Sequence, residues 1–286
     1  MKKIIVLVPI FNDWESLIKL LNDINISIED ITNHEFNCIV INDSSTAKQP
    51  KILKPSNIKT LKIINMKKNR GHARCNAFGI RHINNNEIFD YVILMDGDGE
   101  DRPTELKDLV DSISNNPDIS VVAKRIKRSE GPIFQLMYQI HKLTTYIFTG
   151  KKINFGNYSC LTKQDIKILS DKPSLWSSYS GSVKRHLKKF NEIDSIRGIR
   201  YFGPSKMSLF NLAIHSFSII AVFKYQVFLR SCFLIVLLSF LNNFVGVYSI
   251  FIQILLVIFC LLIFIVSLRE NEKDLLECHN NLSDKQ

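Results

Sequence analysis

The sequence predicts an α/β domain with a mostly parallel sheet, followed by helices that associate with a membrane. Short runs rich in Val, Ile and Leu alternate with longer helical stretches, which is the rhythm of α/β folds. Two of these runs end in acidic residues. Near the end of the chain, Ser231–Leu268 is a run of 38 residues with no charged side chain, a composition typical of membrane segments.

The apolar runs predict strands that helices bury on both faces, because most of them continue without polar alternation. The expected strands are 4–8, 38–41, 60–64, 91–95 and 119–123, and the helices between them are 14–25, 72–84 and 104–115. Later residues predict a helix over 131–150, an extended segment over 154–161, and helices near 163–169 and 177–189.

Charge and cysteine content narrow the function classes. The 286 residues carry a formal net charge of +10, which suits nucleic acid, anionic lipid or a phosphorylated substrate. Basic clusters lead toward the apolar run, which favours lipid headgroups and phosphates, and no nucleic-acid-binding signature is present. We therefore expect no nucleic-acid partner. The six cysteines form no CxxC pair, so we expect the polar part of the chain to face a reducing cytoplasm.

The uncharged run is too long for one membrane crossing. As a single helix it would extend about 57 Å, against about 30 Å of hydrocarbon. We expect a hairpin of two spans that turns at Asn242-Asn243 or at Gly246. Basic residues flank both ends of the run, which places both ends in the cytoplasm. A buried hairpin inside a soluble protein is the alternative, although the remaining chain is short for covering it.

The segment before the run has a different character. In 207–223, Asn211, His215 and Ser218 form a polar stripe on an otherwise apolar helix, as in helices that lie in the membrane interface. A third span here is the alternative, and it would place the tail outside. The expected organisation is a domain over 1–206, an interfacial helix over 207–226, two spans over 227–269 and a cytoplasmic tail over 270–286.

The most specific chemical signal is a pair of acids after the strand at 91–95. Asp96 and Asp98 point the same way because strand side chains alternate, Gly97 between them permits close approach of a ligand, and Glu100 takes the next even position. Such oxygen donors suit Mg²⁺ or Mn²⁺. The alternative is an acidic loop in which Asp101 caps a helix that begins near Pro103.

Four motifs in order resemble glycosyltransferase family 2, while P-loop, dinucleotide and zinc motifs are absent. The chain is similar to the membrane-anchored branch that includes dolichol-phosphate mannosyltransferase and bacterial polyprenyl-phosphate glycosyltransferases. The matching segments are 8–13 (VPIFND), 40–45 (VINDSS), 69–72 (NRGH) and 95–101 (MDGDGED), with 200–206 (RYFGPSK) resembling the stretch before the anchor.

The resemblance implies a GT-A fold, a nucleotide-sugar donor and an inverting transfer assisted by Mg²⁺ or Mn²⁺. Asp96 and Asp98 would be the catalytic DxD pair and, with Glu100, the metal ligands. The implied donor-binding residues are Pro9, Asn12, Asp43, Asn69, Gly71, His72 and Asp96. Ser44 replaces the usual glycine, and Ala47 or Lys48 stands where another acid is common, which leaves the choice of nucleotide open.

The resemblance also implies a lipid or lipid-linked acceptor at a bacterial inner membrane, reached by a cytoplasmic domain on a multi-pass anchor. Arg125 and Arg128 stand where such enzymes bind the acceptor phosphate, and a homo-oligomer is compatible with this arrangement. A polyprenyl phosphate needs no strong general base. A glycan hydroxyl, the alternative acceptor, would need one, for which Glu130 and Asp165 are candidates. An inactive membrane scaffold is the remaining alternative.

Overall fold

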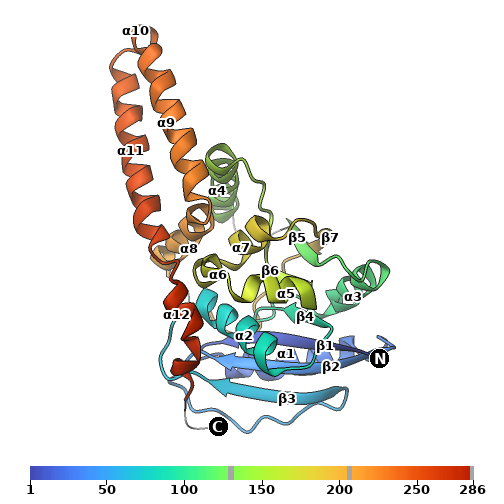
Figure 1. Ribbon diagram of the computed structural model, residues 1–286. Helices are drawn as coiled ribbons and strands as arrows, with labels where there is room; N and C mark the ends of the chain where they lie inside the picture. Colours follow the sequence, from blue (N-terminus) through green and yellow to red (C-terminus); the bar gives the residue numbers. More distant parts are fainter. Residues whose placement is uncertain (128–131, 205–207, 284–286) are drawn as a thin grey trace.

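A single seven-stranded sheet forms the centre of the molecule, in the order β3-β2-β1-β4-β6-β5-β7. The computed structural model describes residues 1–127, 132–204 and 208–283 (Figure 1). The strands are β1 (Lys2–Ile10), β2 (His34–Asn42), β3 (Ile58–Asn65), β4 (Tyr91–Leu94), β5 (Val121–Lys127), β6 (Phe155–Thr162) and β7 (Asn191–Ile196).

The sheet is parallel on one side and mixed on the other. β1 pairs in parallel with β2 and β4, and β2 pairs in parallel with β3. β6 runs antiparallel to both β4 and β5, whereas β5 and β7 are parallel. The predicted parallel sheet is therefore confirmed for β1 to β4, and β6 makes the whole sheet mixed. Because parallel strands end at one edge, the acids after β2 and β4 are brought together there.

Helices cover both faces of the sheet. Alternating side chains of β1 enter two separate cores: Ile5 and Leu7 face one, while Ile4, Val6 and Val8 face the other, as the two-residue strand period requires. The helices of the domain are α1 (Trp14–Ser27), α2 (His72–Asn86), the short 3₁₀ helix η1 (Pro103–Glu105), α3 (Leu106–Asn115), α4 (Pro132–Thr149), α5 (Lys163–Ser170), α6 (Pro173–Ser177) and α7 (Tyr179–His186).

Two local predictions are corrected. The helix expected over 177–189 is shorter and ends at His186. It begins at Tyr179, because Ser178 has extended backbone angles and its side chain accepts a hydrogen bond from the Gly181 N–H as the cap of α7. The cap expected at Asp101 is also wrong. Arg102 precedes Pro103 at the start of η1, and Asp101 turns inward to accept a hydrogen bond from the Asp96 N–H at 2.9 Å.

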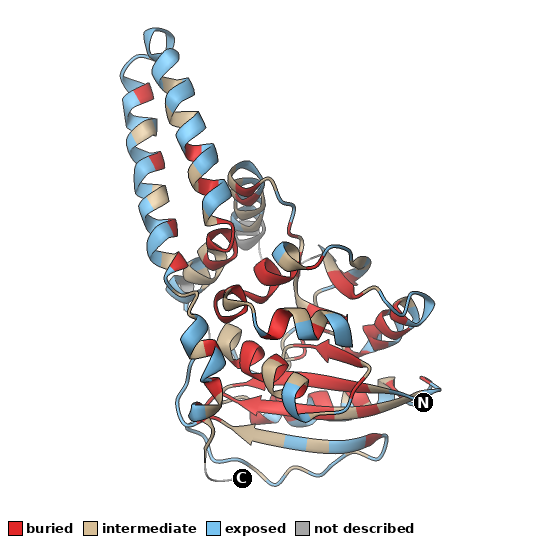
Figure 2. Ribbon diagram, viewed as in Figure 1, coloured by how far each residue is buried: buried red, intermediate tan, exposed pale blue. Residues whose placement is uncertain are grey.

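Four helices follow the domain: α8 (Leu209–Ala221), α9 (Lys224–Phe240), α10 (Asn242–Val245) and α11 (Val247–Ser267). α9 and α11 rise side by side from the domain and are joined at the tip by α10 (Figure 1). Gly246, with φ of +64°, makes the final turn before α11, within the region where the sequence places a turn. The two helices are exposed along most of their length (Figure 2).

The membrane prediction is matched by one candidate helix. Among the described residues, the stretch from Val247 to Leu276 is long and apolar enough to cross a bilayer. α8 and α9 together reach that length only as a pair bent by 85°. Length and composition thus identify one candidate span, and the two-span anchor stays a prediction.

The chain returns to the domain after the hairpin. α12 (Glu272–Leu276) and the 3₁₀ helix η2 (Cys278–Asn281) lie against α2 and α6 (Figure 1). Leu275 and Cys278 are buried in the same core as the α2 side chains, and Leu282 forms an antiparallel bridge with Met66 just beyond the edge strand β3. The segment predicted as a cytoplasmic tail is thus packed against the N-terminal domain as far as residue 283.

Candidate active site

The candidate site lies at the edge of the sheet where β1, β2 and β4 end. Asp43 directly follows β2, and Asp96 and Asp98 follow β4. β1 lies between these strands and pairs with both. Ligands of α/β proteins collect at this edge. Gly97 is needed for packing there, since a Cβ at residue 97 would lie 2.7 Å from the Ile10 side chain and 2.9 Å from the Pro9 carbonyl.

Asp43 holds the loop that leads into α2. Its carboxylate accepts hydrogen bonds from the N–H groups of Arg70 (2.9 Å) and Gly71 (2.8 Å). Burial raises the pKa of Asp43, and these two N–H groups oppose the rise. Gly71 adopts φ of +89°, in the left-handed region that favours glycine. The sharp turn at Gly71 sets His72 as the first residue of α2.

His72 and Asp96 form an ion pair inside the site. His72 Nε2 lies 3.2 Å from Asp96 Oδ1, and the Asn157 amide on β6 contacts both, at 2.6 Å from the imidazole and 3.1 Å from the carboxylate. Burial opposes the charge on each partner, but their attraction outweighs it. The pKa of His72 is raised, and the pKa of Asp96 is held below its usual range.

Asp98 and Glu100 are each paired with an arginine from one later segment. Arg200 Nη1 lies 2.7 Å from Asp98 Oδ2, and the same guanidinium contacts Asp13, the residue before α1. Arg197 pairs with Glu100. Residues 197–204, here called the crossing segment, therefore lie over residues 96–101, here called the acidic loop.

The hydrogen bonds of the crossing segment to the acidic loop include main-chain ones. Gly198 N–H donates to the Glu100 carbonyl and Tyr201 N–H donates to the Asp98 carbonyl. The Tyr201 ring lies directly on Gly99, where a Cβ would overlap it. The Tyr201 hydroxyl reaches Asp23 of α1 at 2.6 Å, so the crossing segment joins α1 to the candidate site.

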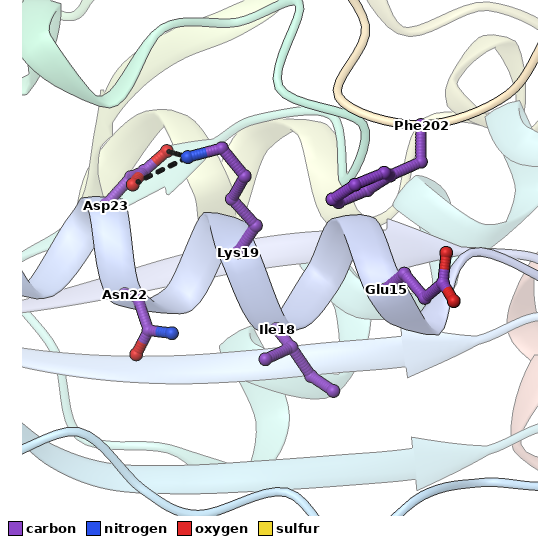
Figure 3. A pocket seen from close by; sticks show the side chains of 6 residues that line it. All are labelled: Glu15, Ile18, Lys19, Asn22, Asp23 and Phe202. Atoms are coloured by element: carbon purple, nitrogen blue, oxygen red, sulfur yellow. Dashed lines mark hydrogen bonds and ion pairs between the residues drawn. The ribbon is translucent and has the colours of Figure 1, made fainter.

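A hollow of about 500 Å³ lies on the exposed side of α1. Figure 3 shows Phe202 of the crossing segment over Lys19 and Glu15, and Lys19 paired with Asp23. Only Phe202 comes from outside α1. The hollow contains none of the predicted donor, acceptor or metal residues, and we assign it no role.

Arg125 brings positive charge to the same edge from β5. Its Nη2 lies 3.8 Å from Asp101 Oδ1, and its guanidinium lies on Gly156 of β6, where any side chain would overlap it. His215 of α8 is within electrostatic reach of His72, Asp96 and Arg125. The helix that leads into the hairpin therefore faces the candidate site.

The acids fit a divalent cation by their chemistry. Burial, followed by the charge of Asp96, raises the pKa of Asp98 to about 6 and that of Asp101 to about 7, because neighbouring buried carboxylates repel one another. Asp98 already forms an ion pair with a cationic group, the guanidinium of Arg200. Within the described residues, however, no three His, Cys, Asp or Glu side chains converge in a ready-made metal cage.

Several predicted residues have structural contacts that the sequence did not reveal. Pro9 lies within β1, and the Asn12 side chain holds the loop after β2, accepting from the Ala47 N–H at 2.9 Å and donating to Thr46 at 3.0 Å. Asn69 is exposed in the loop before α2. Their donor roles stay predictions. Arg128 and Glu130 lie outside the described residues.

Asp165 is not placed to act as a base at this site. Its carboxylate contacts Ser120, and it follows Thr162, which pairs with Tyr91 at the beginning of β4. It therefore lies at the opposite edge of the sheet from Asp96. Sequence reasoning missed Asp13, Asn157, Arg197 and Arg200 as members of the site. Arg200 stands in the quoted segment 200–206, but its sequence position gives no sign of its contact with Asp98.

Comparison with known proteins decides the family. The sequence profile of glycosyl transferase family 2 matches residues 5–173, more than half of the chain. The chain belongs to glycosyl transferase family 2. The match covers β1 to β6 and both segments that carry Asp43 and the Asp96–Asp98 pair, which confirms the family resemblance.

One curated relative is an undecaprenyl-phosphate 4-deoxy-4-formamido-L-arabinose transferase of Photorhabdus laumondii. It is 26% identical over 222 residues, which are 74% of this chain and 65% of the relative. The chain thus spans about two thirds of the length of that relative.

Among solved structures, the chain resembles glucosyl-3-phosphoglycerate synthase from Mycobacterium tuberculosis, in complex with Mn²⁺, UDP-glucose and phosphoglyceric acid. The TM-score is 0.51 at 14% identity, covering 79% of this chain and 80% of the synthase. The complex of the same synthase with phosphoglyceric acid alone matches with a TM-score of 0.51 at 15% identity over the same shares. The likeness confirms the GT-A-like fold.

Proposed function

We propose that the protein transfers a sugar from a nucleotide-sugar to a membrane-bound polyprenyl phosphate, by a metal-assisted inverting reaction. The observation that carries this proposal is the gathering of Asp43, Asp98 and Arg125 at the one sheet edge that α8 faces. The residues proposed to bind the donor and the base of the apolar hairpin thus lie on the same side of the domain. The relative named for undecaprenyl phosphate supports the acceptor class.

The donor would lie along the ends of β1 and β2. Asp43 and the loop 69–72 would bind the nucleoside, and His72 would bring a positive charge beside the diphosphate, a role that its raised pKa supports. Asn157 of β6 donates to Asp96 at 3.1 Å and so fixes the carboxylate that faces the imidazole. The solved structure with UDP-glucose and Mn²⁺ supports this class of donor.

Asp96 and Asp98, with Glu100 beside them, are the residues that would hold Mg²⁺ or Mn²⁺. The cation would stabilise negative charge as it develops on the leaving diphosphate. For Asp98 and Glu100 to act as ligands, Arg200 and Arg197 must leave the carboxylates that they contact here. These arginines belong to the crossing segment, so donor loading would move that segment.

The acceptor would approach from the hairpin side. Arg125 offers a cation for one phosphate group, and α4, which follows β5, exposes a row of apolar side chains: Leu136, Met137, Ile140, Leu143 and Ile147. α4 packs beside α9, and Arg230 Nη1 of α9 donates to the Ile147 carbonyl at 2.9 Å. An exposed apolar row that adjoins the hairpin supports contact with lipid at this level.

The docked C-terminal segment supports an even number of membrane crossings. Residues before the hairpin and after it contact Arg185 of α7: its Nη1 donates to the Val222 carbonyl at 2.7 Å and lies 3.9 Å from the Glu270 carboxylate. Lys224, the first residue of α9, lies 3.3 Å from the same carboxylate. Two ends held on one domain lie on one side of a bilayer. We therefore propose that α9 and α11 form a two-span anchor of an inner-membrane protein whose catalytic domain is cytoplasmic.

A phosphate acceptor also matches the described residues past Asp101, among which we identify no carboxylate placed as a general base. A lipid phosphate is ionised near neutral pH and attacks without losing a proton, whereas a sugar hydroxyl must transfer one. Asp165, one candidate base, lies at the opposite edge of the sheet, and Glu130, the other, lies outside the described residues. The site therefore favours the phosphate over the hydroxyl of a lipid-linked glycan.

The test uses membranes that contain the protein and a panel of radiolabelled nucleotide-sugars. We expect the label in a lipid extract as a mild-acid-labile monophosphate sugar that requires Mg²⁺ or Mn²⁺. Arg125→Ala should lose this product, while Lys124→Ala, a neighbouring cation paired with Asp194 at 3.7 Å, should retain it. Label on a pre-existing glycan alone would contradict the polyprenyl-phosphate acceptor.

A further inference from the structure

The C-terminal segment after the hairpin, residues 271–283, is hydrogen-bonded to the loop 67–72, which carries predicted donor-binding residues. Asn281 makes three contacts with two residues of that loop: its carbonyl accepts from the Lys67 N–H at 2.7 Å, its Oδ1 accepts from the Lys68 N–H at 3.1 Å, and its Nδ2 donates to the Lys68 carbonyl at 2.9 Å. Asn281 is 8% exposed. A buried amide with both of its ends bonded fixes the loop backbone in one position.

Residues on both sides of Asn281 also contact the domain. The Ser283 N–H donates to the Asn65 carbonyl at 2.8 Å, and Leu282 bridges Met66. The segment thereby extends the pairing at the end of β3, which is the edge strand of the sheet. Leu275 and Cys278 are buried in the core beside α2, and the His279 ring lies 5.6 Å from that of Phe78.

Lys67 and Lys68, which Asn281 contacts, precede the predicted donor-binding residue Asn69 by two positions and one position. Lys67, Lys68, Asn69 and Arg70 are all exposed, so the loop has little packing of its own. It is held from the site side by Asp43, through the Arg70 and Gly71 N–H groups, and from the far side by Asn281. A loop between two such anchors is ordered before a ligand arrives.

We propose that the segment 271–283 is a positioning element that pre-orders the loop 67–72 for nucleotide binding, with Asn281 as its central residue. The inference rests on the proposed donor role of that loop. Because the segment directly follows α11, it also ties the donor side of the domain to the membrane hairpin. Asn281 does not touch the expected nucleotide position; it acts through Lys67 and Lys68.

The test compares full-length Asn281→Ala with Asn280→Ala, both purified in detergent. Asn280 is exposed in the same short helix, so its substitution is a matched control. Amide hydrogen exchange of residues 66–71, measured without nucleotide, should become about tenfold faster in Asn281→Ala and stay unchanged in Asn280→Ala. Unchanged exchange in Asn281→Ala would overturn the proposal.

The second readout is the affinity for UDP, GDP, CDP and dTDP with Mn²⁺, measured by calorimetry. We expect the Kd of the bound nucleotide to rise about tenfold in Asn281→Ala, with kcat at saturating donor unchanged. Asn281→Asp, which keeps the oxygen that accepts from Lys68, should show a smaller rise. A purely structural residue would lower the thermal midpoint without this separation of Kd from kcat.

The outcomes separate the two proposals. Binding of a nucleotide by the native chain and, equally well, by Asn281→Ala would overturn the positioning role alone. Failure of the native chain to bind any of the four nucleotides would overturn the proposed donor class, and the positioning role with it. If Asn281→Ala does not fold, Asn281→Asp supplies the same comparison, and equal exchange and equal Kd in that variant would again refute the role.

Discussion

Arg200 Nη1 lies 2.7 Å from Oδ2 of Asp98, the second acid of the DxD pair. The same guanidinium contacts Asp13, the residue before α1, so one arginine joins the start of α1, the acidic loop and the crossing segment. A divalent cation and this arginine would compete for Asp98. The contact therefore links metal binding to the position of residues 197–204.

Removal of Arg200 should strengthen metal binding in the absence of nucleotide. Without the guanidinium, Asp98 loses a competing cation, and we expect Arg200→Ala to lower the Kd for Mn²⁺ by about three- to tenfold, as measured by electron paramagnetic resonance. Lys2→Ala is the matched control, because it removes a cation paired with Asp90 at the opposite edge of the sheet. A weaker or unchanged affinity in Arg200→Ala would argue against competition.

Removal of the Asp98 charge should abolish most of the transfer activity. Asp98→Asn keeps the shape of the side chain but loses a charge that we propose holds the metal, and we expect a rate loss of about 100-fold or more. Asp194→Asn removes an exposed carboxylate on β7 and should leave the rate unchanged. Activity that survives both Asp98→Asn and chelation would exclude the metal role, and a native chain without activity would favour the inactive scaffold.

The sequence predicts the parallel half of the sheet well because these strands are buried on both faces. β1 has seven consecutive buried residues, and such runs are visible without any partner. β7 (NEIDSI) was missed since its exposed and half-buried positions hold Glu, Asp and Asn, and an edge strand of this kind has little apolar pattern. β5 was predicted too short because it ends in Lys124, Arg125 and Lys127.

The site was predicted where it depends on local spacing and missed where it depends on distant pairing. Asp96 and Asp98 are recognisable from their place after a strand, and Asp43 from the same rule. Arg200 meets Asp98 across 102 positions, and Asn281 meets Lys68 across 213. Neither pair has a periodicity that a single sequence reveals. The folding of the C-terminal segment onto the edge of β3 was missed for the same reason.

A side chain at Gly156 should act through Arg125. A methyl group there would overlap the guanidinium, so Gly156→Ala should displace Arg125 and raise the acceptor KM about tenfold, on the scale of one charged hydrogen bond to phosphate. The donor KM should stay unchanged. The double variant should be no worse than Arg125→Ala alone, since both changes remove one interaction. Additive losses would show that Gly156 acts separately.

Stability should fall as the pH drops below the ordinary range of histidine. Burial, with the charges of Arg185 and Lys172, lowers the pKa of His186 to about 4, and its Nε2 lies 3.0 Å from the buried Ser174 hydroxyl. The unfolded chain binds this proton near pH 6.5 and the folded chain near pH 4, so protonation favours unfolding between these values.

The thermal midpoint measured from pH 7.5 to pH 4.5 checks this sign. His186→Asn should flatten the decline, by less than about 1.4 kcal/mol per pH unit because the ring is partly exposed. His34→Asn, at the start of β2, is the comparison variant and should keep the native slope. If the thermal midpoint of His186→Asn falls with pH as steeply as that of the native chain, other groups cause the decline.

The hairpin topology is testable with two engineered thiols. Phe244 is 88% exposed in α10 at the tip, and Asn280 is exposed in the segment that docks on the domain. In intact bacterial cells, a membrane-impermeant thiol reagent should label Phe244→Cys and spare Asn280→Cys until the membrane is opened, with the native chain as background control.

A third span through α8, or a single span through α11, would instead expose residue 280 and protect residue 244. Either reversed pattern would also require Asn281 to leave Lys68 and Leu282 to leave Met66, because the catalytic domain and the segment would then lie on opposite sides of the bilayer. These contacts are the physical reason to expect labelling at the tip alone.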